Sequence, residues 1–134
     1  MMKDKKFSIS RRIKSFGYAF KGIFFAFKTQ HNIWIHSLAI IVVLIAGFIC
    51  KLNIMEWGLV VLAIGLVLVS EMINTAIEWL VDLVSPDYSE KAGLIKDVAA
   101  GAVLIAAIIA VIIGAIVFLP KITKAFHLIA ERNF

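Results

Sequence analysis

The stretch EMINTAIEWLVDLV, residues Glu71 to Val84, ends an apolar segment long enough to cross a bilayer, yet it carries three carboxylates and an asparagine. Drawn as a helix at 100° per residue, four polar side chains share one narrow stripe: Glu71, Asn74, Glu78 and Asp82. A charge near the middle of a membrane helix costs about 2.5 to 3.5 kcal/mol on insertion scales, and such residues usually face a bundle interior or a wet cavity. The stripe therefore predicts a functional site; the alternative is a polar clamp that holds an oligomer together.

The composition places the chain in a membrane. Of its 134 residues, 62% are hydrophobic and 17% are charged, and the mean hydropathy is +0.98, whereas soluble domains contain about 45 to 50% apolar residues. The net charge is +5, and eight basic residues precede the first long apolar segment. This distribution favours an anionic bilayer surface, and not nucleic acid, as the partner of the basic residues.

Three segments have the length of about 20 residues that a hydrocarbon core of about 30 Å requires. They span residues 33–50, 56–84 and 94–119, and a tail, 120–134, follows them. Between about residues 7 and 29, apolar side chains recur at steps of three and four with basic residues opposite, which is typical of a helix lying in the membrane surface. The alternative for this segment is a plain basic anchor. We therefore expect a single all-α membrane domain over residues 1–134, with a cytoplasmic N-terminus because of the early basic residues.

The third apolar segment is rich in small residues, beginning with Ala99, Ala100, Gly101 and Ala102. Small residues let membrane helices approach one another closely. Because three spans alone can hardly enclose a site, the sequence predicts an oligomer.

Spacing along the stripe separates the roles of its acids. Glu71 and Glu78 are seven residues, or about 10 Å, apart along a helix axis, whereas two metal ions acting together lie within about 4 Å. Glu78 and Asp82 lie nearer the cytoplasmic end, where they can reach a water-soluble ligand, and Glu71 lies deeper, where a carboxylate can accept a proton. Lys96 and Asp97 begin the third span at the level of Asp82, and a lysine there can hold a phosphate. The alternative for this pair is ordinary snorkelling at the membrane surface.

Other chemistries do not fit the spacing of the polar residues. The sequence has neither a Walker-type phosphate loop nor G-x-G-x-x-G after a strand pattern. His31 and His36 are five residues apart and do not share a helical face, which argues against zinc. A proton or cation channel would also use the carboxylate stripe, but it would not need Lys96 beside Asp97.

The segment EMINTAIEWLVD resembles the signature of the prokaryotic diacylglycerol kinase family, and GYAFKG and KDVAAGAVL extend the resemblance over most of the chain. The resemblance implies a homotrimer in the bacterial inner membrane, in which each subunit has an N-terminal amphipathic surface helix and three transmembrane helices. It implies transfer of the ATP γ-phosphate to the hydroxyl of a membrane lipid with the help of Mg²⁺. Diacylglycerol, which would give phosphatidic acid, is favoured by a small margin. Undecaprenol, which would give undecaprenyl phosphate, is the alternative.

The family's site residues map onto this chain through the same motifs. Glu71 would be the base that takes the proton of the lipid hydroxyl, and Glu78 would bind Mg²⁺. The expected nucleotide contacts are Arg11, Tyr18, Gln30, Asn74, Glu78, Asp82, Asp87, Tyr88, Ser89, Lys96 and Asp97. Gln30 departs from the family, which commonly has a metal-binding glutamate there. Its carbonyl oxygen can coordinate Mg²⁺ but adds no negative charge.

Overall fold

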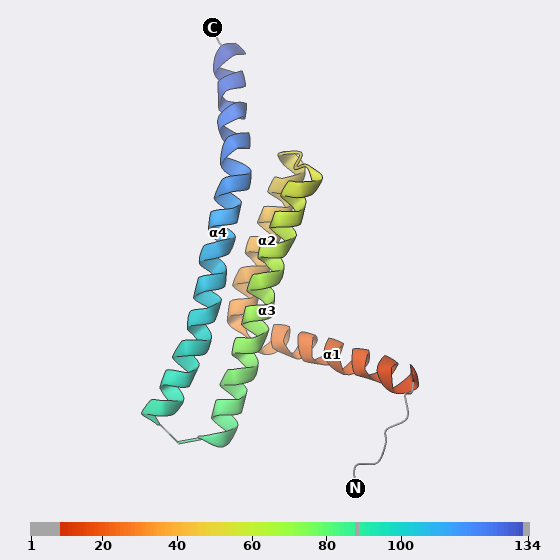
Figure 1. Cartoon of the computed structure of the whole chain (residues 1–134), viewed down its shortest axis with the longest axis vertical. Coiled ribbons are helices and arrows are strands. Elements are labelled where there is room, and N and C mark those ends of the chain that lie inside the picture. The colour runs from red at the N-terminus through yellow and green to blue at the C-terminus, as the bar shows by residue number, and fades with distance from the viewer. Residues whose placement is uncertain (1–8, 88, 133–134) are drawn as a thin grey trace.

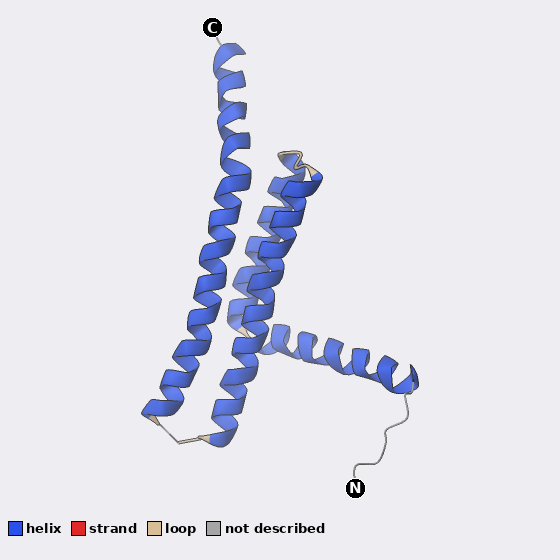
Figure 2. Ribbon diagram, viewed as in Figure 1, coloured by secondary structure: helices blue, strands red, loops and turns tan. Residues whose placement is uncertain are grey.

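The structure, a computed structural model, describes residues 9–87 and 89–132, which form helices joined by short connectors (Figure 2). The helices are α1 (Ile9–Thr29), α2 (His31–Ile49), α3 (Ile54–Val84) and α4 (Glu90–Arg132). Three of them, α2, α3 and α4, are long and apolar enough to cross a membrane. They run side by side, whereas α1 leaves the bundle sideways (Figure 1). The predicted all-helical fold, with one helix before three long apolar helices, is thus confirmed, although residues 7 and 8 of the expected first helix lie outside the described residues.

A single extended residue makes the corner between α1 and α2. Gln30 has φ −106° and ψ 115°, and its N–H still donates to the carbonyl of Ala26 at 2.9 Å. Most apolar side chains along α1 are exposed, and only Ala26 and Phe27 near its end are buried or half-buried, as expected of a helix that lies on a membrane. Near its end, Phe25 packs edge-to-face on Trp79 of α3, with ring centroids 4.9 Å apart. This contact fixes the end of α1 beside the carboxylate stripe.

The turn between α2 and α3 is held by a capping box. The Asn53 side chain accepts from the N–H groups of Met55 and Glu56 at 2.9 and 3.0 Å, and Glu56 accepts from the N–H of Asn53 at 2.7 Å. These bonds satisfy donors that the start of a helix leaves free. Glu56 also pairs with Lys121 of α4 at 2.8 Å, so the start of α3 is tied to α4 eleven residues before α4 ends.

Close packing at the same end depends on Gly47 of α2. A Cβ atom at this position would lie 2.7 Å from the Trp57 ring of α3, a distance that real side chains do not tolerate. The absent side chain therefore lets Trp57 reach the backbone of α2. Trp57 packs against a buried cluster of Leu52, Val60 and Val117, so α2, α3 and α4 share a small apolar core at this end.

The last helix is longer than the predicted span of residues 94–119. It begins at Glu90 and continues through Pro120 to Arg132, so that it extends well past the α2–α3 turn (Figure 1). Pro120 removes one helical N–H, and just beyond it the Thr123 hydroxyl donates to the carbonyls of Leu119 and Pro120 at 3.1 Å. As far as Arg132, the predicted tail thus continues α4.

Candidate active site

A cleft of about 290 Å³ lies between α2, α3 and α4 on the carboxylate stripe. From α3 it is lined by Glu71, Asn74 and Glu78, whose spacing of three and four residues places them on one face. The facing wall comes from small and aliphatic residues of α4: Ala100, Val103, Leu104 and Ala107. The third side, from α2, is lined by Asn32, Ile35 and His36. The cleft therefore has polar side chains from α3 and α2 that face an apolar wall from α4.

Glu71 is the most buried acid of the site, with 2% of its surface exposed. Its Oε1 atom lies 2.9 Å from Nε2 of His36 on α2. His36 is five residues beyond the start of α2, so the pair lies about 7.5 Å along the axis from the corner with α1. If α1 marks the membrane surface, the carboxylate lies just below it, at the depth where a lipid hydroxyl can approach.

His36 was not among the predicted site residues. Its spacing from His31 argued against zinc, and nothing on its own helix indicated a partner 35 residues away. The available signal was a polar side chain at the start of an apolar span, which is costly unless paired. A polar side chain at this place marks His36 as a candidate functional residue. It does not show that Glu71 is the partner of His36.

Asn74 and Glu78 form the second polar pair of the cleft. Asn74 is 5% exposed, and its amide nitrogen donates to Oε1 of Glu78 at 2.9 Å. Its carbonyl oxygen is buried without a hydrogen-bond partner in the part of the chain that the structure describes, as is the hydroxyl of Thr75. A buried acceptor of this kind is one that a bound cation or water would satisfy.

Asp82 lies beyond the cleft, although it belongs to the same stripe. Its carboxylate accepts a hydrogen bond from Lys96 of α4, and both side chains are more than a third exposed. An exposed ion pair is worth only about 0.2 to 1 kcal/mol. A phosphate group can therefore replace Asp82 as the partner of Lys96 at little cost in free energy.

The remaining predicted nucleotide contacts that the structure describes do not line the cleft of a single chain. Arg11 and Tyr18 are exposed on α1, and Gln30 is half-buried at its corner with α2. Three more predicted contacts lie along the α3–α4 connector and the first turns of α4: Asp87, Ser89 and Asp97. Tyr88 lies outside the described residues.

The donors in the cleft suit a magnesium ion carried by a nucleotide. Among the described residues, no three His, Cys, Asp or Glu side chains gather closely enough to hold a metal ion. Mg²⁺, however, usually binds one or two carboxylates and takes its other ligands from phosphates and water. Glu78 and the unpartnered amide oxygen of Asn74 supply oxygen donors of this kind.

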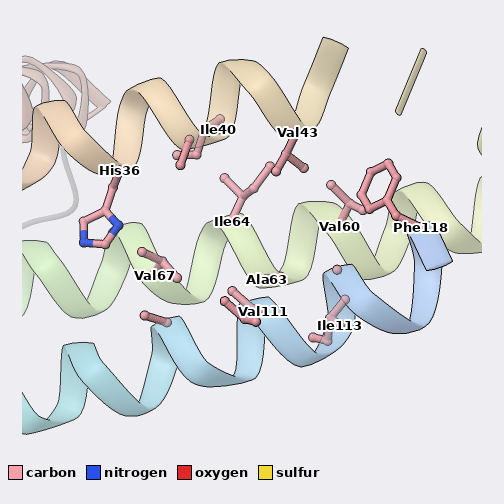
Figure 3. Close-up of a pocket in the computed structure, with 14 residues that line it drawn as sticks. His36, Ile40, Val43, Val60, Ala63, Ile64, Val67, Val111, Ile113 and Phe118 are labelled. Atoms are coloured by element: carbon pink, nitrogen blue, oxygen red, sulfur yellow. The ribbon is translucent and has the colours of Figure 1, made fainter. Parts of the chain in front are cut away.

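An apolar cavity of about 390 Å³ continues from the cleft along the three spans. His36 and Ala107 line both spaces. Figure 3 shows His36 at one end of the cavity and Phe118 at the other, with aliphatic side chains such as Ile64 and Val67 between them. The polar cleft and the apolar cavity thus meet beside His36 and Glu71.

Comparisons with known proteins agree on one family. The family model described as prokaryotic diacylglycerol kinase matches residues 17–118, which include the whole cleft. The undecaprenol kinase of Bacillus subtilis (strain 168) is 42% identical over 120 residues, covering 90% of this chain and 98% of that protein. A diacylglycerol kinase of Synechocystis sp. is 43% identical over 109 residues, covering 81% of this chain and 62% of that protein. The diacylglycerol kinase of Escherichia coli K12 is 31% identical over 111 residues, covering 83% of this chain and 91% of that protein.

Proposed function

Because the chain belongs to the prokaryotic diacylglycerol kinase family, we propose that it transfers the γ-phosphate of ATP to the hydroxyl of undecaprenol. The prediction of a membrane lipid kinase is confirmed by the family and by relatives named as kinases. The choice of acceptor is the proposal. The sequence alone favoured diacylglycerol by a small margin, but the undecaprenol kinase is similar over 98% of its length. Diacylglycerol remains the second candidate because the Synechocystis relative bears that name and is 43% identical.

The observation that carries the proposal is the position of Glu71 where the cleft meets the apolar cavity. A lipid alcohol has a hydroxyl at one end of a hydrocarbon chain, so it needs a polar site joined to an apolar channel. The cavity runs along α3 from Val67 to Val60, about 10 Å farther from α1. A lipid whose hydroxyl lies at Glu71 can therefore place the first part of its chain in the cavity and the rest in the bilayer.

The described residues can carry out the transfer as follows. Glu71 accepts the proton of the acceptor hydroxyl while the hydroxyl oxygen attacks the γ-phosphorus, and the bond to ADP breaks. Glu78 and Asn74 would hold Mg²⁺, which neutralises the phosphate charge. Lys96 leaves Asp82 and donates to a phosphate oxygen of the nucleotide instead. Positioning and charge neutralisation supply most of the catalysis in phosphoryl transfer, so this set of groups is sufficient.

We also propose that the working unit is a homotrimer in the bacterial inner membrane, with the N-terminus in the cytoplasm. No α1 residue lines the cleft of its own chain, although Arg11 and Tyr18 are expected to contact the nucleotide. A neighbouring subunit's α1 can supply them. The exposed apolar side of α1 and its basic residues suit an anionic membrane surface.

The test is a kinase assay on purified protein with γ-labelled ATP and Mg²⁺, offering undecaprenol and diacylglycerol in separate mixed micelles. We expect label in undecaprenyl phosphate, with kcat/KM at least about tenfold above that for diacylglycerol. The reverse preference would assign diacylglycerol as the acceptor. Label in neither lipid, from folded protein, would reject the kinase and return attention to a proton or cation channel.

A further inference from the structure

The contact between His36 and Glu71 has no part yet in the proposed reaction. It joins two spans, α2 and α3, at a distance of 2.9 Å between Nε2 and Oε1. Glu71 is almost fully buried, whereas the His36 side chain keeps 25% of its surface exposed. One side of the contact is therefore fixed in the bundle, and the other borders the open space where a lipid would enter.

The surroundings of Glu71 leave His36 as the group that orients it. On α3, the nearby polar side chains Asn74 and Glu78 are bonded to each other, and the Thr75 hydroxyl makes no hydrogen bond among the described residues. Asn32 of α2 also lines the cleft, but the side chain within bonding distance of Glu71 is His36. The wall that α4 gives to the cleft, from Ala100 to Ala107, carries no charged side chain. A glutamate side chain has three rotatable bonds, and packing alone does not set the direction of its carboxylate. A hydrogen bond from another helix sets this direction.

We propose that His36 is a positioning residue for Glu71. Its Nε2–H donates to Oε1 and holds the carboxylate so that the second oxygen, Oε2, faces the acceptor hydroxyl. This inference rests on the proposed function, because Glu71 must be the base for its orientation to matter. His36 itself touches neither nucleotide nor metal in this arrangement.

The position of His36 strengthens this role. It lines both the polar cleft and the apolar cavity, so the oriented oxygen lies where a hydroxyl arrives at the head of a hydrocarbon chain. A displacement of a reacting group by about 1 Å can cost about a hundredfold in rate. Freeing the Glu71 carboxylate from His36 allows displacements of that size.

The test compares His36→Gln with His36→Met in the full-length protein, using the better of the two lipid acceptors. Glutamine keeps an N–H donor at a similar reach, and methionine has a similar size but no donor. We expect His36→Met to lower kcat by about tenfold to a hundredfold and to leave KM for ATP unchanged. We expect His36→Gln to retain kcat within about threefold of wild type.

His31 provides the matched control, because it is an exposed histidine on the same helix that does not line the cleft. His31→Met should retain wild-type kcat. Gel filtration and circular dichroism in detergent establish that each variant is folded.

Wild-type kcat in His36→Met would overturn the inference, as would an equal loss of kcat in His36→Gln and His36→Met. A change confined to KM for ATP, or a His36→Met protein that does not fold, would also overturn it by showing a binding or structural role. In all these outcomes the wild-type protein is active and the proposed function stands. A wild-type protein that phosphorylates neither lipid would instead reject the proposed function itself.

Discussion

Replacing Glu71 by glutamine tests the proposed base with little disturbance of the fold. The side chain is 2% exposed, so a substitution of different size would disturb packing. Glutamine has the same length, and its carbonyl oxygen can still accept from His36, which now lies 2.9 Å from Oε1. The amide cannot take up a proton, so the substitution removes the base, together with its negative charge, while keeping the size of the side chain.

The expected effect follows from the role and the position of Glu71. A positioned general base contributes about 10² to 10⁴ in rate, or about 3 to 5 kcal/mol of barrier at 1.36 kcal/mol per tenfold. Of the expected nucleotide contacts on α3, Asn74 lies about 4.5 Å from Glu71 along the axis, Glu78 about 10 Å and Asp82 about 16 Å. Asn74 is bonded to Glu78 and not to Glu71, so the substitution leaves its bond in place. We therefore expect Glu71→Gln to lower kcat at least a hundredfold while KM for ATP stays within about threefold.

The assay follows labelled phosphate into extracted lipid under saturating acceptor, with nucleotide binding measured separately by a fluorescent ATP analogue. Glu56→Gln is the matched control, because it makes the same change on α3 but at the end tied to Lys121, and glutamine still completes a capping box. It should retain wild-type kcat. A loss of kcat below tenfold in Glu71→Gln, or a parallel loss of ATP binding, would refute Glu71 as the base.

Three further substitutions test the nucleotide site, the metal site and the helix packing. Lys96→Ala should raise KM for ATP about tenfold or more, because a hydrogen bond to a charged group contributes about 1.5 to 3 kcal/mol; an unchanged KM would reject Lys96 as a phosphate ligand. Gln30→Glu should keep activity and shift the Mg²⁺ titration of the rate to lower concentration, whereas an unchanged titration would count against Gln30 as a ligand. Gly47→Ala should destabilise the bundle by about 1 to 3 kcal/mol, since its methyl group would meet Trp57 at 2.7 Å; thermal unfolding in detergent measures the loss, and an unchanged midpoint would mean that α2 shifts freely.

The fold could be predicted from the sequence because the bilayer restricts what each segment can do. The first two predicted spans, 33–50 and 56–84, differ from α2 and α3 by no more than two residues at each end. The third prediction stopped at Leu119, where hydropathy falls, but a helix needs only its own backbone bonds to continue into water. Hydropathy therefore predicted the membrane-spanning part of α4 well, but it did not predict where α4 ends.

The candidate site was predictable only where one helix determines it. Glu71, Asn74 and Glu78 share a face because of their spacing, and the structure places all three in one cleft. The contacts of Glu71 with His36 and of Asp82 with Lys96 join different helices. Such contacts depend on the rotation and height of each helix, which a single sequence does not specify.

The heights of these residues along α3 explain how one helix can serve two reactants of opposite solubility. Its 31 residues span about 46 Å, whereas the hydrocarbon core is about 30 Å thick, so about 16 Å must lie outside. The His36–Glu71 pair lies about 7.5 Å below the level of the α1 corner, and Asp82, eleven residues farther along α3, lies about 9 Å above it. In the reaction that we propose, a lipid hydroxyl reaches Glu71 from the bilayer while a nucleotide reaches Lys96 and Asp82 from water. Glu78 lies between these heights, where the transferred phosphoryl group would pass.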